Sequence, residues 1–327
     1  MQKGWKYYAC LLGSQLMWPF LAMKHETGLF SFNDADAESP VLVTTDYYLT
    51  VYRVMESIEK QRLKCHLLIV DGRGINVWCG SRGGSVDTES VLAAIVETKL
   101  EGQVTHRELI LPQLAASSVS KTVLRSNGWR AKFGPVEIDD VSEFIDRGYE
   151  KSAEESIATF NLGRRLEYNL GHLVFETVMF LVMTAVFWLL GHLGGVFLSW
   201  NIFWTANLIL IVLGAWILGT FMAIVDPVMP TSSGYVRGLL TGIIVLVIWK
   251  VSFQVYSWIS PEEILYILKW LDITGLTIIG LSLFVGFNWG GSTPQLGEDQ
   301  MIRDIIVGLG TLVVLFALGF YFPNGIF

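Results

Sequence analysis

The residues with the clearest chemical potential lie in one loop, residues 71–87, with the sequence DGRGINVWCGSRGGSVD. Its five glycines allow the backbone to approach a bulky group closely. Trp78 and Cys79 stand in the middle, and a cysteine in a special setting can be reactive. The loop lacks G-x-G-x-x-G and the Lys-Ser/Thr of a phosphate loop, which argues against nucleotide binding. A flexible surface loop with an incidental Cys79 is an equally good interpretation.

The elements around this loop must position it, and apolar runs alternate with helical patterns over residues 39–147. We expect strands at 41–45, 65–71, 108–111 and near 132–133, and helices at 49–58, 88–100, near 114–127 and from 140. This alternation predicts βαβ units and a mostly parallel, Rossmann-like sheet.

Ligands of such sheets bind beyond the carboxyl ends of the strands. Thr44, Thr45 and Asp46 end the first strand, and Pro112 and Gln113 follow the third, so we expect both loops to face the same crevice as the glycine-rich loop. Turn and cap chemistry is an equally good interpretation of these residues.

The composition divides the chain in two. Of 327 residues, 52% are hydrophobic and 16% charged, with a mean hydropathy of +0.48. Residues 170–327 hold only 4 of the 23 Lys and Arg residues and 8 of the 30 Asp and Glu residues. A soluble domain carries about a quarter charged residues, so the second half is membrane-like. The net charge of −7 argues against nucleic-acid binding.

Five apolar stretches in the second half are long enough to cross a bilayer, which takes about 20 residues each. They are 172–191, 203–225, 238–258, 264–286 and 305–322. The positive charges that precede the first stretch and lie in the second and fourth loops put residues 1–170 in the cytoplasm and the C-terminus outside; they are Arg164, Arg165, Arg237 and Arg303. Glu176 and Lys250 lie within expected spans, where such groups can reach the interface or line a transport path.

The chain is therefore expected to comprise an N-terminal segment (1–38), a cytoplasmic α/β domain (39–165) and an all-α transmembrane domain of five helices (166–327). We expect the first 23 residues to pack on the α/β domain or on the membrane surface, because their apolar run is broken and lacks a cleavage site. The three cysteines, Cys10, Cys65 and Cys79, are too few for a disulfide framework or a zinc site. Cys65 begins a strand and is expected to be a small buried hydrophobe.

Several segments resemble a known family. Asn76-Val-Trp-Cys79, after an apolar strand ending in Asp, resembles the corrinoid-binding loop of the mercury-methylating corrinoid protein and of its relative, the corrinoid iron–sulfur protein of acetyl-CoA synthesis. Further segments are similar to the strands and turns of that family: 39–44, 48–50, 109–114 and 134–136 with Tyr149. Residues 287–293, Phe-Asn-Trp-Gly-Gly-Ser-Thr, resemble a stretch of the mercury methylator. The five expected spans point to this membrane-bound branch.

The resemblance implies a corrinoid cofactor with Cys79 as the lower axial ligand of its cobalt. Asn76, Val77, Trp78, Gly80 and Ser81 would then lie against the corrin. It further implies methylation of Hg(II) to methylmercury, a methyl donor of the methyltetrahydrofolate type and a ferredoxin-like iron–sulfur reductase as partner. This chain has too few cysteines to hold an iron–sulfur cluster itself. The protein would sit in the cytoplasmic membrane of an anaerobe.

The sequence departs from the family after the cysteine. The family continues Cys-Ala-Ala-Gly-Lys-Gly-Thr, whereas this chain has Cys79-Gly-Ser-Arg-Gly-Gly-Ser85. Gly83 stands in place of the lysine, and Arg82 beside it could supply a positive charge. A relative that passes methyl to another acceptor in one-carbon metabolism is therefore an alternative. A membrane transporter or sensor with a cytoplasmic ligand-binding domain is a second alternative.

Overall fold

The computed structural model describes most of the chain, which divides into two compact units. The described residues are 23–74, 86–159, 161–193, 198–229, 233–257, 273–292 and 298–321, together with positions 5, 9 and 13. Unit 1 is Met1–Phe160 and unit 2 is Asn161–Phe327. Most of the N-terminal 23 residues and part of the fourth expected span lie outside the described residues.

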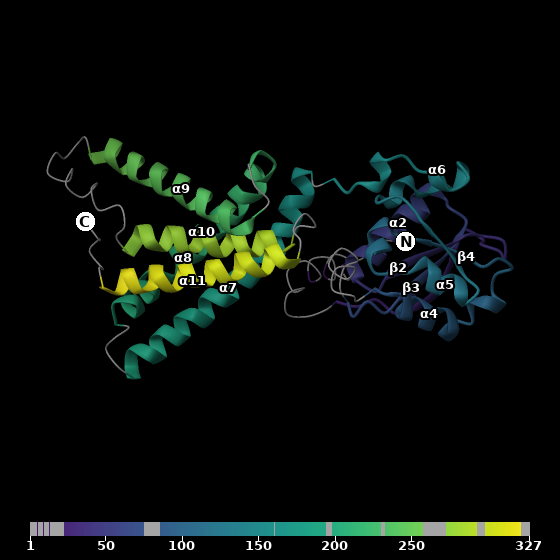
Figure 1. Cartoon of the computed structure of the whole chain (residues 1–327), viewed down its shortest axis with the longest axis horizontal. Helices are drawn as coiled ribbons and strands as arrows, with labels where there is room; N and C mark the ends of the chain where they lie inside the picture. The colour runs from purple at the N-terminus through teal and green to yellow at the C-terminus, as the bar shows by residue number, and fades with distance from the viewer. Residues whose placement is uncertain are drawn as a thin grey trace. The chain divides into compact units, whose positions relative to one another are not determined.

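Unit 1 is built on a five-stranded sheet in the order β1-β3-β2-β4-β5 (Figure 1). Its strands are β1 (Gly28–Phe32), β2 (Val41–Thr45), β3 (Cys65–Val70), β4 (Glu108–Leu111) and β5 (Arg130–Phe133). The last four are parallel to one another, and β1 runs antiparallel to β3 at one edge. The prediction of a mostly parallel α/β sheet is confirmed. The antiparallel strand β1 was not predicted.

The helices of unit 1 are α2 (Tyr48–Gln61), α4 (Thr88–Glu97), α5 (Lys121–Ser126) and α6 (Val141–Asp146). Short 3-10 turns lie between them: η1 (Leu100–Gly102), η2 (Gln113–Ser117), η3 (Ile138–Asp140) and η4 (Glu154–Ser156). The single helix predicted near 114–127 is wrong, because η2 and α5 are separate. Ser120 begins α5 as an N-cap whose side chain accepts from the Val123 backbone N–H, and such caps start a new helix.

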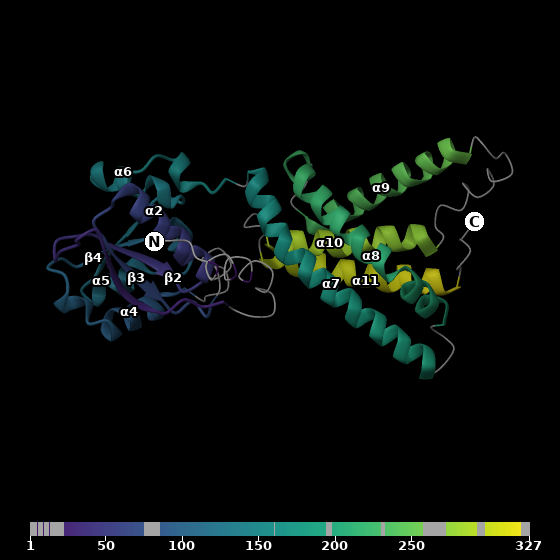
Figure 2. The ribbon, with the colours of Figure 1, turned by 180° about the vertical axis from the view of Figure 1, so that it is seen from behind.

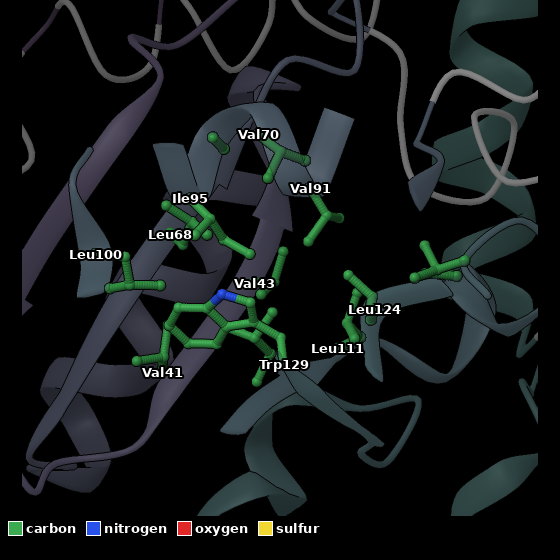
Figure 3. Close-up of a cluster of buried hydrophobic side chains, with 14 of the residues drawn as sticks. Val41, Val43, Leu68, Val70, Val91, Ile95, Leu100, Leu111, Leu124 and Trp129 are labelled. Atoms are coloured by element: carbon green, nitrogen blue, oxygen red, sulfur yellow. The ribbon is translucent and has the colours of Figure 1, made fainter. Parts of the chain in front are cut away.

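The sheet of unit 1 separates two hydrophobic cores. One joins α4 and α5 to the sheet around the fully buried Trp129, as Figure 3 shows. The other joins α2 and α6 to the opposite face and contains Phe144 and Cys65. Every residue of β2 and β3 is buried, as expected for central strands covered on both faces. The two cores hold the central strands in place from both faces, and so also hold the loops that follow these strands.

Unit 2 contains five long helices among its described residues, seen from the two sides in Figures 1 and 2. They are α7 (Leu162–Leu193), α8 (Leu198–Val225), α9 (Gly234–Ser257), α10 (Ile273–Ser292) and α11 (Glu298–Tyr321), with a 3-10 turn, η6 (Asp226–Val228), after α8. Two stretches, Leu162–Val186 and Ile211–Val228, are long and apolar enough to cross a membrane. Among the described residues the apolar stretches of α9 and α10 are shorter, so five spans stay a prediction.

Helices α9 and α10 approach each other through glycines. A Cβ added to Gly238 would lie 2.6 Å from Ser282 O, and one added to Gly286 would lie 2.5 Å from Gly234 O. Gly234, Gly238 and Gly242 recur at every fourth residue of α9, the spacing at which small residues let two helical backbones touch. This contact is therefore intolerant of larger side chains.

The N-terminal part of helix α7 exposes leucines and buries polar side chains. Leu166 and Leu170 are exposed, whereas Arg165 and Asn169, each one position earlier, are buried. Soluble helices show the reverse arrangement. Asn169 Nδ2 donates to Thr220 Oγ1 of α8 at 3.4 Å, so polar contacts lie between these two helices.

Candidate functional site

The candidate site lies at the carboxyl edge of the sheet in unit 1. In the order β3-β2-β4, the chain passes from β2 to β3 on one side of β2, and then to β4 on its other side. In open α/β sheets, ligands bind at such a reversal, just beyond the strand ends. Strands β2 and β4 pair Val41 with Leu109 and Leu42 with Ile110, so both end at the same edge.

The side chain of Asp46, directly after β2, holds the start of the glycine-rich loop that follows β3. Asp46 Oδ1 accepts the backbone N–H of Gly72 at 2.9 Å and that of Gly74 at 3.0 Å. Gly72, Gly74 and Asp46 are all buried. A carboxylate that accepts two buried backbone amides forms charge-assisted hydrogen bonds, which are stronger than neutral ones. The first four residues of the loop, 71–74, are thereby fixed to the end of β2.

Lys24 ties this arrangement together from the N-terminal side. Its Nζ donates to Asp71 Oδ1 at 2.9 Å and lies 3.4 Å from Asp46 Oδ2. Asp71 Oδ1 also accepts the backbone N–H of Arg73 at 2.8 Å. The hydrogen bond to Asp71 raises the pKa of Lys24, and the same bond lowers the pKa of Asp71. Both groups are therefore charged at neutral pH.

Gly72 is required by close approach rather than by an unusual backbone angle. A Cβ at this position would lie 2.0 Å from Thr45 Oγ1 and 3.1 Å from Thr45 Cβ. Any other residue would push the loop away from β2. Arg73 and Gly74 then turn the chain with positive φ angles of 59° and 69°, a region that glycine occupies at little cost.

The other end of the loop is held by a capping box. Asp87 Oδ1 accepts the Ser90 N–H at 2.8 Å, and Ser90 Oγ accepts the Asp87 N–H at 3.1 Å. These reciprocal bonds fix the first turn of α4. Asn76, Val77, Trp78, Cys79, Gly80 and Ser81 lie outside the described residues, within 75–85. The structure thus defines how both ends of the predicted cofactor loop are anchored.

The other four predicted site residues lie at this edge, with different surroundings. Thr44 and Thr45 are buried, and Thr45 packs against Gly72, so these threonines support the loop. Pro112 precedes η2 and Gln113 begins it. Both are only partly buried.

Lys151 joins the ends of β4 and β5 at the same edge. Its Nζ donates to Phe133 O at 2.9 Å, to Gly134 O at 3.1 Å and to Gln113 Oε1. Burial lowers the pKa of this lysine. The Gln113 amide nitrogen makes no hydrogen bond with the described residues and stays available as a donor.

Sequence reasoning missed the contributions of Lys24 and Lys151, and it noted Asp46 only as a strand end. An acidic residue directly after a central strand was the available signal for Asp46. The partners of the two lysines lie 17 or more residues away in sequence, and no local pattern encodes such contacts.

A groove of about 480 Å³ lies beside both ends of the loop. It is lined by residues of β1, β3 and α4 and by the loop ends, including Asp71, Arg73, Asp87 and Glu97. Its acidic lining does not suit an anion. Among the described residues, no group of three or more His, Cys, Asp or Glu side chains could hold a metal ion. Cys65 is fully buried, and burial raises the pKa of its thiol to about 12, which confirms that it is a small buried hydrophobe.

Comparison with known proteins places similarity over unit 1. Residues 18–145 match a family model described as CO dehydrogenase/acetyl-CoA synthase delta subunit. The acetyl-CoA decarbonylase/synthase complex subunit gamma of Methanopyrus kandleri is 36% identical over 122 residues, and that of Methanocaldococcus jannaschii is 34% identical over 130. The corrinoid/iron-sulfur protein large subunit of Moorella thermoacetica is 30% identical over 127 residues.

These matches cover part of each protein. They include 37%, 40% and 38% of this chain and 26%, 26% and 28% of the respective relatives. The chain therefore spans about a quarter of the length of the curated relatives that it matches. The matched region contains the whole sheet, the Asp46 contacts and the loop with Cys79.

Proposed function

We propose that unit 1 binds a corrinoid and that the protein carries out corrinoid-dependent methyl transfer, with Hg(II) as the acceptor and methylmercury as the product. One observation carries this proposal. The Asn76-Val-Trp-Cys79 segment belongs to a loop anchored by Asp46 at the ligand-binding edge of the sheet, inside the region that matches the corrinoid proteins. Resemblance in sequence and the anchoring of the loop therefore point to the same edge.

The described edge fits such a group in its chemistry. It is made of small or polar residues, Thr44, Thr45, Gly72, Gly74 and Gly134, and of the partly buried Gln113 with its available amide donor. A Cβ on Gly134 would already crowd Ile110 Cγ2 at 3.2 Å. Glycines let a backbone approach a bulky group closely, and an amide donor can orient a polar group of the ligand.

The roles of individual residues follow from the resemblance. Cys79 would be the lower axial ligand, and Asn76, Val77, Trp78, Gly80 and Ser81 would lie against the corrin. When bound, the corrinoid supplies a methyl group on cobalt, and a thiolate ligand tunes the electronics of that metal. Asp46 and Lys24 would hold the start of the loop in place, and Asp87 its end.

Protein partners are part of the proposal. Relatives are named as subunits of an acetyl-CoA decarbonylase/synthase complex, which supports a role within a larger methyl-transfer system. We propose a ferredoxin-like iron–sulfur protein as reductant and a methyl donor of the methyltetrahydrofolate type.

We further propose that unit 2 inserts in the cytoplasmic membrane as a multi-pass domain, with unit 1 in the cytoplasm and the C-terminus outside. Two candidate spans and the inverted polarity of α7 support this setting. A polar face turned inward and an apolar face turned outward suit a lipid environment. The expected spans at 203–225 and 172–191 overlap these two candidates, and residues 238–258, 264–286 and 305–322 would supply the remaining three.

The test is anaerobic reconstitution of the full chain with methylcobalamin and a reductant, followed by addition of Hg(II). Wild type should bind corrinoid with a thiolate-type absorption spectrum and release methylmercury. Cys79→Ala should lose both signals. Cys65→Ala is the matched control, because Cys65 is buried in the core, and it should keep both. A corrinoid spectrum unchanged in Cys79→Ala would contradict the ligand assignment.

A second acceptor is favoured by one sequence feature. Gly83 stands where the mercury methylator has lysine, so the charge beside the cofactor differs. Corrinoid binding without methylmercury formation, beside an active homologue as positive control, would indicate another methyl acceptor in one-carbon metabolism.

A further inference from the structure

Helix α7 carries a buried arginine, Arg165, that has no side-chain partner among the described residues. Arg165 lies in the first turn of α7 and is only 9% exposed. Its Nε has no hydrogen-bond partner, and its guanidinium makes no hydrogen bond or ion pair with any residue that the structure describes. The sequence had indicated a loop charge that precedes the first span. The structure instead places Arg165 within α7, with its Nε fully enclosed and the side chain mostly buried.

A second buried arginine among the described residues has different surroundings. Arg237 of α9 is 4% exposed and forms an ion pair with Asp226 of η6. An unpaired buried charge is strongly unfavourable, whereas a well-paired one is tolerated. The contrast indicates that Arg165 is paired by something that is not part of the described chain.

Two further donor-bearing side chains share the buried face of α7. Asn169 and His172 follow Arg165 by four and seven residues, which puts all three on one side of the helix. Asn169 is 3% exposed and His172 is 6% exposed. Gly219 of α8 makes room for this row, because a Cβ there would lie 2.9 Å from Asn169 Oδ1.

The chemistry of the row favours an anion. A guanidinium matches two oxygens of a phosphate or carboxylate at once. An amide and an imidazole ring add N–H donors, and the first turn of a long helix carries partial positive charge. Glu176, the next buried group on this face, lies about 16 Å from Arg165 along the helix axis. At that distance the Glu176 carboxylate does not neutralise the Arg165 guanidinium, so the Arg165 end of the row carries a positive charge.

We propose that Arg165, Asn169 and His172 form a binding site for a phosphate-type oxyanion at the N-terminal end of α7, occupied by the headgroup of an anionic phospholipid. The source of the anion rests on the proposed membrane setting, since Leu166 and Leu170 on the outer face would contact acyl chains. Basic sites between membrane helices on the cytoplasmic side bind anionic headgroups in this way.

The experiment uses the full chain in phosphatidylcholine nanodiscs that contain a minor fraction of phosphatidylglycerol. Retained lipid is counted by native mass spectrometry after release into detergent. Wild type should keep phosphatidylglycerol selectively. Arg165→Gln should weaken retention roughly 10- to 100-fold, the range for a lost charged hydrogen-bond pair. Arg164→Gln removes the same charge from the adjacent, less buried position and should change retention less than about 3-fold.

Further arms separate the outcomes. His172→Gln, which keeps an N–H donor, should retain lipid better than His172→Leu, and this pair covers the case that Arg165→Gln does not fold. Protection of delipidated protein against heat by inorganic phosphate, without selective lipid retention, would keep the oxyanion site but overturn its lipid occupant. Equal retention in wild type and Arg165→Gln, with no effect of phosphate, would overturn the site. The corrinoid spectrum of each sample reports separately on unit 1, so failure of the proposed function stays distinguishable.

Discussion

Removal of the Asp46 carboxylate tests how the cofactor loop is anchored. In Asp46→Ala, the buried N–H groups of Gly72 and Gly74 lose an acceptor that lies at 2.9 and 3.0 Å. An unsatisfied buried donor costs about 1–3 kcal/mol, and water entering the vacated space offsets part of that cost. We expect about 2–4 kcal/mol of local destabilisation at the loop start. Asp46→Asn keeps an acceptor oxygen and should cost only about 1–2 kcal/mol.

Hydrogen exchange measured by mass spectrometry gives the most direct readout. The expected destabilisation corresponds to roughly 30- to 1000-fold faster exchange at residues 72–74. The matched control is Lys64→Gln, which removes a 2.6 Å ion pair with Asp36 at the surface. That variant should change exchange at the loop by less than a factor of about 2, since exposed pairs contribute little. Unchanged protection of Gly72 and Gly74 in Asp46→Ala would refute the anchoring role.

Three further outcomes are expected. Gly238→Ala should reduce the stability of unit 2 in detergent by about 1–3 kcal/mol, seen as a lower melting temperature. Gly310→Ala, at a position with open space around it, should leave the melting temperature unchanged or raise it. Equal effects of the two substitutions would contradict the glycine contact between α9 and α10. Hydrogen bonds, chiefly from Lys64, lower the pKa of Asp36 to about 2. In thermal melts, wild type should therefore be more stable than Asp36→Asn above about pH 4, and this difference should disappear as the pH falls towards 2. Cys65, with its pKa near 12, should resist iodoacetamide at pH 8 until denaturation, as read by peptide mass spectrometry.

The sequence predicted those parts of unit 1 whose pattern is set by burial on both faces. Strands β2, β3 and β4 are mostly apolar, and their positions and parallel direction were predictable. Strand β1 was not, because Gly28–Phe32 is an edge strand of mixed burial, GLFSF, paired only with β3. Edge strands lack a strong hydrophobic signal, since only part of the strand is covered.

The site shows the same division. That Thr44, Thr45, Pro112 and Gln113 lie at one edge follows from sheet topology, which alternation of elements predicts. The bonds from Gly72 and Gly74 to Asp46 depend on an approach between segments 26 and 28 residues apart. No local pattern contains that distance. The buried state of Arg165 was equally inaccessible, because a charge near a helix end is more often solvated than enclosed.

The two anchors of the glycine-rich loop also bear on how such a protein can diverge. Asp46 fixes the chain as far as Gly74, and the capping box fixes it again from Asp87. Insertions or substitutions between Gly74 and Asp87 should therefore not disturb the sheet or its cores. Residues 75–85 lie between these two anchors, so under the proposed function a lineage could change the methyl acceptor through substitutions at these eleven positions without refolding the domain. The residues after Cys79 that differ from the mercury methylator lie between these two anchors, where such changes are tolerated.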